Sequence, residues 1–130
     1  MKGNRRRDTR PEQALRSLLH KRGRRFRVDL PIPAESRKPR PDVVFTRQRV
    51  AVFVDGCFWH RCPRHGRVPG GANREYWVAK MARNQQRDLD DTAALTAAGW
   101  KVVRIWEHVG VGDAVAIVED ALLARSDRTP

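Results

Sequence analysis

Apolar positions recur with helical spacing near the start of this chain. Thr9 and Glu12, three positions apart, have the spacing of a capping box and predict the start of a helix. An apolar stripe follows at intervals of three and four residues, and Gly23 marks the predicted end of the helix. The stripe comprises Ala14, Leu15, Leu18 and Leu19.

Strand patterns follow this helix. Residues 26–30 alternate apolar and polar side chains, which predicts a half-buried strand. Residues 31–41 contain four prolines and predict an irregular connection. The β-branched runs at 43–45 and 50–54 are separated by four residues, so they predict a hairpin. The second run is apolar on both faces, which is typical of a central strand.

The C-terminal half predicts a crossover connection. Asn73 is a candidate N-cap for a long helix that Gly99 ends. Residues 101–106 predict a further strand, and residues 112–124 a last helix. Because a long helix joins two strands, we expect those strands to pair in parallel. The fold class is therefore expected to be α/β, with a mixed sheet flanked by helices.

The length of 130 residues predicts one domain. We expect residues 1–8 to form a disordered basic arm, residues 9–125 the domain and residues 126–130 a tail. No apolar run approaches the roughly 20 residues of a membrane span. No apolar stretch follows the basic start, as it would in a secretory signal, so we expect a cytoplasmic protein with no membrane association.

Charge changes this picture, because it is large and uneven. The formal net charge is +12, and the first 50 residues hold 16 of the 27 Lys and Arg with 5 of the 15 acidic residues. Such an excess favours nucleic acid as a partner, since basic side chains displace counterions from phosphates. The alternative is an arginine-rich surface with no partner.

Asp42 is the first candidate for chemistry, because it stands at the start of a predicted strand. A carboxylate at a sheet edge is suited to Mg²⁺, which prefers hard oxygen ligands and supports phosphodiester hydrolysis. The alternative is an ordinary turn aspartate.

A Cys- and His-rich loop is the second candidate. Cys57 and Cys62, with His65 three positions later, present three ligands of the kind that Zn²⁺ prefers. A structural zinc site needs a fourth, which the residues leave open between His60 and His108. Two free thiols with surface histidines are the alternative, and a disulfide is disfavoured in a reducing compartment.

Large aromatic residues are the third feature. Phe58 and Trp59 lie in the same loop, outside any apolar period, and Trp77 lies near the start of the long helix. Aromatic side chains on a basic surface can stack on bases or wedge into a duplex. Packing over the loop, or in the core for Trp77, is the alternative.

Taken together, these residues resemble the Vsr (very short patch repair) family of DNA mismatch endonucleases. The resemblance extends over roughly residues 8–108 in the same order, and the Gly-Cys-Phe-Trp-His segment is highly specific. The matching positions are Thr9 with Glu12, Pro41-Asp42, the segment from Val52 to His60, Trp77 with Lys80, Asn84, Arg87-Asp88, Gly99-Trp100 and Trp106-Glu107-His108.

This resemblance implies a fold similar to the restriction-endonuclease-like core and an activity on double-stranded DNA. The implied reaction is Mg²⁺-dependent nicking of one strand, 5′ to the thymine of a T·G mismatch left by deamination of 5-methylcytosine. It also implies a bacterial, nucleoid-associated monomer with functional links to a DNA cytosine methyltransferase and to mismatch-repair proteins.

The resemblance also implies roles for individual residues. Asp42 matches the metal-binding aspartate, and the backbone carbonyl of Val54 matches a second Mg²⁺ ligand. His60 matches the catalytic histidine, which acts in general acid–base fashion, and Glu12 matches an acidic residue near the site. Asp55 stands where a histidine is found in the best-known members, so it is expected to add a metal ligand or to alter proton transfer.

The remaining implied roles concern zinc, the mismatch and the long helix. The resemblance assigns structural Zn²⁺ to four side chains, wedging beside the mismatch to three aromatics, and supporting positions to two polar residues. These sets are Cys57, Cys62, His65 and His108 for zinc, Phe58, Trp59 and Trp77 for the wedge, and Asn84 and Asp88 for support.

Two other functions stay open at this point. One is a broader-specificity mismatch endonuclease, or a restriction-associated endonuclease, of the same fold. The other is a non-catalytic zinc-containing module that binds DNA, in which Asp42 and His60 would have no chemical role.

Overall fold

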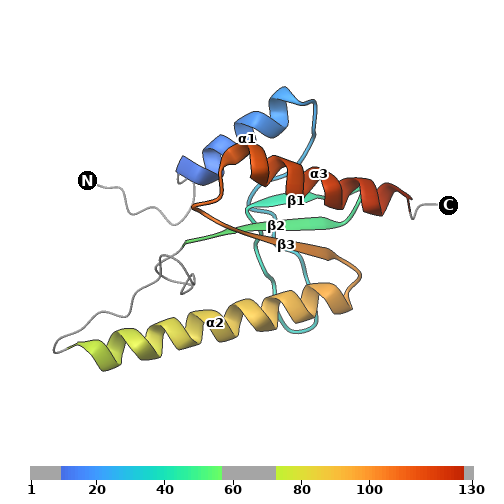
Figure 1. Cartoon of the computed structure of the whole chain (residues 1–130). Helices are drawn as coiled ribbons and strands as arrows, with labels where there is room; N and C mark the ends of the chain where they lie inside the picture. Colours follow the sequence, from blue (N-terminus) through green and yellow to red (C-terminus); the bar gives the residue numbers. More distant parts are fainter. Residues whose placement is uncertain (1–9, 57–72, 128–130) are drawn as a thin grey trace.

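The computed structural model describes residues 10–56 and 73–127, which form a three-layered α/β arrangement (Figure 1). A sheet lies in the middle, with α1 and α3 on one side and α2 on the other. The elements are α1 (Arg10–Lys21), β1 (Val43–Phe45), β2 (Val50–Asp55), α2 (Arg74–Ala97), β3 (Lys101–Trp106) and α3 (Val111–Asp127).

The sheet confirms the predicted hairpin and crossover. Its strand order is β1-β2-β3; β1 pairs with β2 antiparallel, and β2 pairs with β3 in parallel through the connection that contains α2. β2 is the central strand, and all of its residues except Val54 are buried. Its C-terminal end is the part of the sheet on which the candidate site is built.

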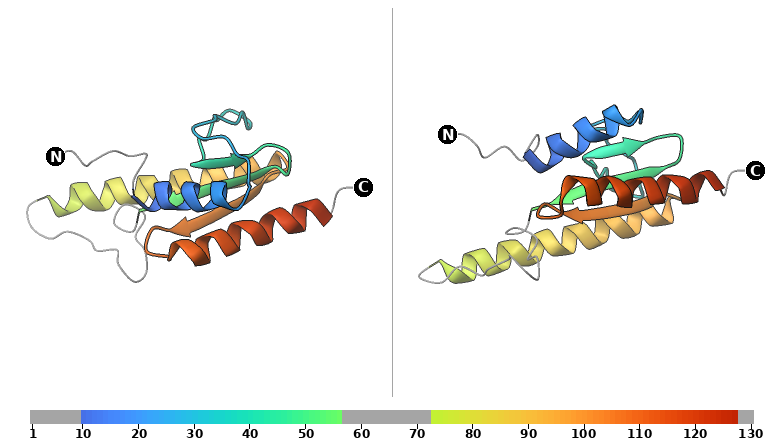
Figure 2. Two further views of the ribbon diagram at one scale, coloured as in Figure 1. Left: turned by 90° about the horizontal axis from the view of Figure 1, so that it is seen from above. Right: turned by 45° about the horizontal axis from the view of Figure 1, so that its top comes forward.

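Two apolar clusters hold the helices against the sheet. On one face, Leu15 and Leu19 of α1 and Val118 and Leu122 of α3 pack with strand residues. On the other face, Leu95 of α2 packs with strand residues and with apolar side chains of the connection before β1. Figure 2 shows α1 and α3 lying on the same face of the sheet. No described helix is both long and apolar enough to cross a membrane.

The prediction of a strand over residues 26–30 is wrong. This segment makes only an isolated antiparallel bridge, in which the backbones of Arg27 and Val44 exchange two hydrogen bonds of 2.8 Å. Asp29 then adopts a positive φ of 55°, which breaks the extended conformation. Val28 is 44% exposed, so its apolar character does not report a buried face.

The predicted N-cap of the long helix also needs correction. Asn73 precedes α2, but its side chain makes no capping hydrogen bond, because its ψ of 16° lies outside the extended region that N-caps adopt. At the other end the prediction is confirmed, since Gly99 has a φ of 94° that favours glycine. α3 is longer than predicted and continues to Asp127.

Candidate active site

Asp42 lies at the C-terminal end of β2, although it precedes β1 in the sequence. The antiparallel register pairs Val43 with Val52, so the residue before β1 comes opposite Phe53, next to Val54. The Asp42 backbone N–H donates to the carbonyl of Val52 at 2.9 Å, and its carboxylate Oδ2 accepts a 2.6 Å hydrogen bond from the Val54 N–H. Both the backbone and the side chain of Asp42 are therefore fixed to β2.

The first turns of α1 bring a second carboxyl group and a cation to the same place. Glu12 is only 2% exposed. Nη2 of Arg16, one turn later, lies 3.4 Å from Glu12 Oε2 and 3.2 Å from the backbone carbonyl oxygen of Asp42. Arg16 thus connects α1 to the start of β1 and supplies positive charge beside the two acidic residues.

The environment of Asp42 favours its neutral form. The pKa of Asp42 is raised from its ordinary value of 3.8 to about 8, mainly by burial and next by a hydrogen bond with Glu12. The Val54 N–H and the charge of Arg16 act in the opposite direction and do not cancel these effects. Two acidic side chains with incomplete charge balance form a place where an added cation is favoured.

The donor set at this place fits a hard divalent cation. Asp42 and Glu12 supply carboxylate oxygens, which are the ligands that Mg²⁺ prefers alongside retained waters. Within residues 10–56 and 73–127, no group of three or more His, Cys, Asp or Glu side chains is placed to hold a metal. A cation between Asp42 and Glu12 would therefore need backbone oxygens or water to complete its ligand shell.

Asp55 lies at the end of the same strand but has a different neighbourhood. It is 8% exposed, and both of its carboxylate oxygens accept from Arg104 Nη1 of β3, at 3.0 and 3.3 Å. Arg104 also lies 3.8 Å from the carboxylate of Asp88 on α2. The structure therefore brings Asp55 and Asp88, two of the predicted site residues, to one arginine.

Three other predicted residues lie in the described part of the chain. Trp77 is half-buried near the start of α2 and contacts Tyr76 edge-on, with ring centroids 5.2 Å apart. Asn84 is half-buried one turn before Asp88, and His108 is exposed in the turn after β3. The other predicted site residues lie outside the described residues: Cys57, Phe58, Trp59, His60, Cys62 and His65.

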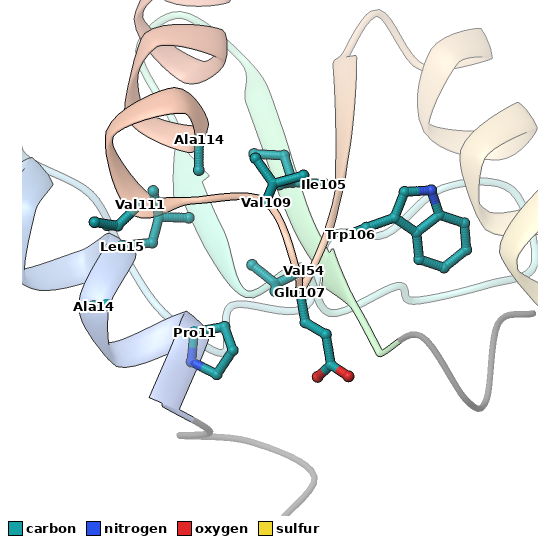
Figure 3. A pocket seen from close by; sticks show the side chains of 10 residues that line it. All are labelled: Pro11, Ala14, Leu15, Val54, Ile105, Trp106, Glu107, Val109, Val111 and Ala114. Carbon is teal, nitrogen blue, oxygen red and sulfur yellow. The ribbon is translucent and has the colours of Figure 1, made fainter. Parts of the chain in front are cut away.

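An apolar cavity of about 240 Å³ adjoins the carboxylate site. It lies between α1, the ends of β2 and β3, and the start of α3, and Val54 is part of its wall (Figure 3). Glu107 is the acidic residue of its lining, and its side chain extends to the same side as Pro11. The lining is otherwise apolar, so the cavity does not itself offer a phosphate-binding surface.

Sequence reasoning missed two arginines that organise this region. Arg16 lies four residues after Glu12, which is the spacing of a helical ion pair and could have indicated the contact. Arg104 is a cation between the apolar residues Val103 and Ile105 of β3, which is a signal for a buried partner. In neither case does the sequence identify the partner across the fold.

Comparisons with known proteins show to which family this chain belongs. The family model described as DNA mismatch endonuclease Vsr matches residues 1–64, which include Glu12, Asp42, Val54 and Asp55. This match covers the carboxylate site and the hairpin on which it is built.

Individual relatives extend the match to the rest of the chain. The type II nicking enzyme V.NaeI of Lentzea aerocolonigenes is 52% identical over 123 residues, covering 94% of this chain and 74% of the relative. The type II nicking enzyme V.XorIIP of Xanthomonas oryzae is 45% identical over 105 residues, covering 77% and 71%. The DNA mismatch endonuclease Vsr of Escherichia coli is 37% identical over 102 residues, covering 78% and 62%. This chain therefore belongs to the Vsr family and is a DNA strand-nicking endonuclease of that family.

Proposed function

We propose that this enzyme nicks one strand of duplex DNA at a mismatch, in the sequence context of a type II system, with Mg²⁺ as its catalytic ion. The carboxyl pair of Asp42 and Glu12 beside the Val54 peptide is the observation that carries this proposal. Family membership implies a metal-dependent nuclease, and this pair is where the described chain offers hard oxygen ligands. The non-catalytic zinc module considered above has no support in a nicking family.

In this proposal Asp42 and Glu12 would hold the ion together with the backbone carbonyl of Val54. A Mg²⁺ held there would supply polarisation of the phosphate and activation of the attacking water. Arg16 restrains the Glu12 carboxylate and the Asp42 backbone, which holds the two acidic residues in fixed positions. Deprotonation of Asp42 accompanies binding of the ion, because a cation favours the carboxylate form.

His60 and the aromatic residues complete the proposed site. We assign general acid–base catalysis to His60, and contact with the mismatch to Phe58, Trp59 and Trp77. An imperfectly stacked mismatch is easier to open than a matched pair, which gives wedging side chains a physical basis for selectivity. Structural Zn²⁺ is assigned to Cys57, Cys62, His65 and His108.

The choice of substrate depends on which relatives are the better guide. The identities of 52% and 45% to type II nicking enzymes support the restriction-associated function over general very-short-patch repair. The 37% identity to DNA mismatch endonuclease Vsr supports a mismatch as the site of nicking. The family resemblance implies that this mismatch is T·G, and with it a functional link to a DNA cytosine methyltransferase. The two ideas are compatible if T·G is recognised within a defined flanking sequence.

A duplex panel tests this proposal. Each of the mismatches and the matched pairs is placed in several flanking sequences, one strand at a time is end-labelled, and nicking is followed in Mg²⁺. We expect one strand to be nicked, only at mismatches, and at a rate that depends on the flanking sequence. Equal nicking of matched and mismatched duplexes would contradict the mismatch function, and equal nicking in every flank would contradict the type II context.

A further inference from the structure

Arg104 joins three elements of the fold through one guanidinium group. It extends from β3 to Asp55 of β2, and its Nε donates to the Thr92 hydroxyl of α2 at 2.9 Å. Its Nη2 donates to the backbone carbonyl of Asp88 at 3.2 Å. Its guanidinium carbon also lies 4.1 Å from the centre of the Phe53 ring. Arginine suits such a position because its planar group presents several donors and stacks on aromatic rings.

Asp55 is held by this arginine in a buried position. Since both carboxylate oxygens accept from Arg104, the charge of Asp55 is compensated inside the protein. Removing the cation alone would leave a buried carboxylate without that compensation. The Asp55 backbone is also fixed, because its carbonyl accepts a 2.9 Å hydrogen bond from the Glu107 N–H.

The neighbouring peptide belongs to the proposed metal site. Val54 directly precedes Asp55, and its N–H donates to Asp42 Oδ2 at 2.6 Å. Val54 is the one half-buried residue of β2, and its strand ends at Asp55. The orientation of the Val54 peptide therefore depends on how firmly Asp55 is held.

We propose that Arg104 and Asp55 act as positioning residues for the nicking site, by fixing the Val54 peptide against Asp42. This inference rests on the proposed function for its catalytic consequence. It assigns Asp55 a role in place of the family histidine: the side chain orders the end of β2 rather than exchanging protons with the substrate. The proposal also explains why an arginine stands between Val103 and Ile105 in the middle of β3.

A double variant separates positioning from simple stability. Arg104→Met with Asp55→Leu replaces both charged side chains by apolar ones of broadly similar size, and such paired replacements are often tolerated by the fold. Arg125→Met is the matched control. Arg125 also donates to backbone carbonyls, of Gln48 and Gly99, but at the opposite end of β2.

Hydrogen exchange of the Val54 amide, measured by NMR in protein without added Mg²⁺, is the first readout. We expect it to quicken by at least about tenfold in the double variant, because a loosened peptide opens more often. The Lys101 amide, which donates to Arg49 at the other end of the sheet, serves as the internal reference and should be unchanged. Unchanged exchange of both amides in a folded double variant would overturn the proposal.

Single-turnover nicking across a Mg²⁺ series is the second readout. We expect the half-saturating Mg²⁺ concentration to rise and the maximal rate to fall by on the order of tenfold in the double variant. The Arg125→Met control should retain wild-type values. If wild-type protein does not nick DNA, the proposed function fails, whereas the Val54 exchange still tests positioning. Faster Val54 exchange with unchanged nicking would reject the catalytic part.

A third set of variants introduces at position 55 the histidine that is found there in the best-known family members. Asp55→His should slow nicking, because it places a donor or a like charge against Arg104. Adding Arg104→Met to Asp55→His should restore part of the loss, since the opposing cation is then removed. A merely structural arginine would give additive losses, so absence of this rescue would contradict the proposed coupling.

Discussion

The carboxylate of Asp42 accepts a hydrogen bond of 2.6 Å from the backbone N–H of Val54, twelve residues later in the chain. This contact joins the residue before β1 to the end of β2. The two groups that we propose as metal ligands, the Asp42 side chain and the Val54 peptide, are therefore parts of one rigid hairpin. Glu12 joins them from α1, so helix and hairpin must be packed correctly for the site to exist.

The raised pKa of Asp42 predicts how stability depends on pH in protein without added divalent metal. The folded-state pKa is about 8 and the ordinary value is 3.8, so the folded state holds the proton more tightly than the unfolded state. The stability contributed by this proton is present below pH 3.8 and is lost as the pH rises through 8. Urea unfolding at a series of pH values measures it.

Asp42→Asn is the control for this pH dependence. In the wild type, Asp42 should lower the free energy of unfolding by up to about 1.4 kcal/mol for each pH unit within this window. The variant cannot ionise, so the difference between the two proteins should grow with pH in favour of the variant. If the free energy of unfolding changes with pH in the same way in both proteins, Asp42 does not titrate as described.

Arg16 is predicted to stabilise the carboxyl pair. Arg16→Met removes the charge beside buried Glu12 and the hydrogen bond to the Asp42 carbonyl, and should lower the free energy of unfolding by about 3 kcal/mol at pH 8. Arg16→Lys keeps the charge and should lose less. Both are measured by denaturant unfolding. Added Mg²⁺ should recover more stability in Arg16→Met than in the wild type, and equal stability of all three proteins would contradict the role of Arg16.

Zinc content tests the proposed structural site. We expect about one Zn²⁺ per chain by elemental analysis of protein purified without chelators, because four soft or borderline ligands are assigned to it. Cys62→Ser should reduce the zinc content and lower the melting temperature. His20→Asn is the control, since His20 stacks on Phe26 in the described fold and has no zinc role. Wild-type protein without zinc would show that the ligand assignment is wrong.

Much of the fold could be predicted because periodicity reports burial directly. The hairpin, the central position of β2 and the crossover to β3 follow from β-branched runs and from the long helix between them. The segment at 26–30 misled prediction, because alternation alone does not require a pairing partner along its whole length. One bridge at Arg27 and the positive φ of Asp29 leave Val28 in solvent.

The sequence predicts candidate residues for the site, but it does not predict the contacts that hold them in place. Asp42 was a candidate because it precedes a predicted strand, and Glu12 because of its family position. The structure brings the two side chains together, and their catalytic roles stay predictions. The partner of Asp55 could not be predicted, because Arg104 is 49 residues away and reaches Asp55 only through the parallel pairing of β2 with β3. Arg16 was missed for a similar reason, since its contact with the Asp42 backbone depends on how α1 packs against the hairpin.

The most direct test of metal-dependent hydrolysis at this site is to measure whether the Asp42→Asn variant still nicks DNA. We compare three proteins on one labelled T·G duplex with and without Mg²⁺: the wild type, Asp42→Asn and the control Asp113→Asn. The side chain of Asp113 is exposed on α3. Binding of the duplex is measured in parallel. We expect Mg²⁺-dependent nicking by the wild type and the control, and none by Asp42→Asn, which should still bind DNA. Nicking by Asp42→Asn at the wild-type rate would contradict the assignment of the catalytic site.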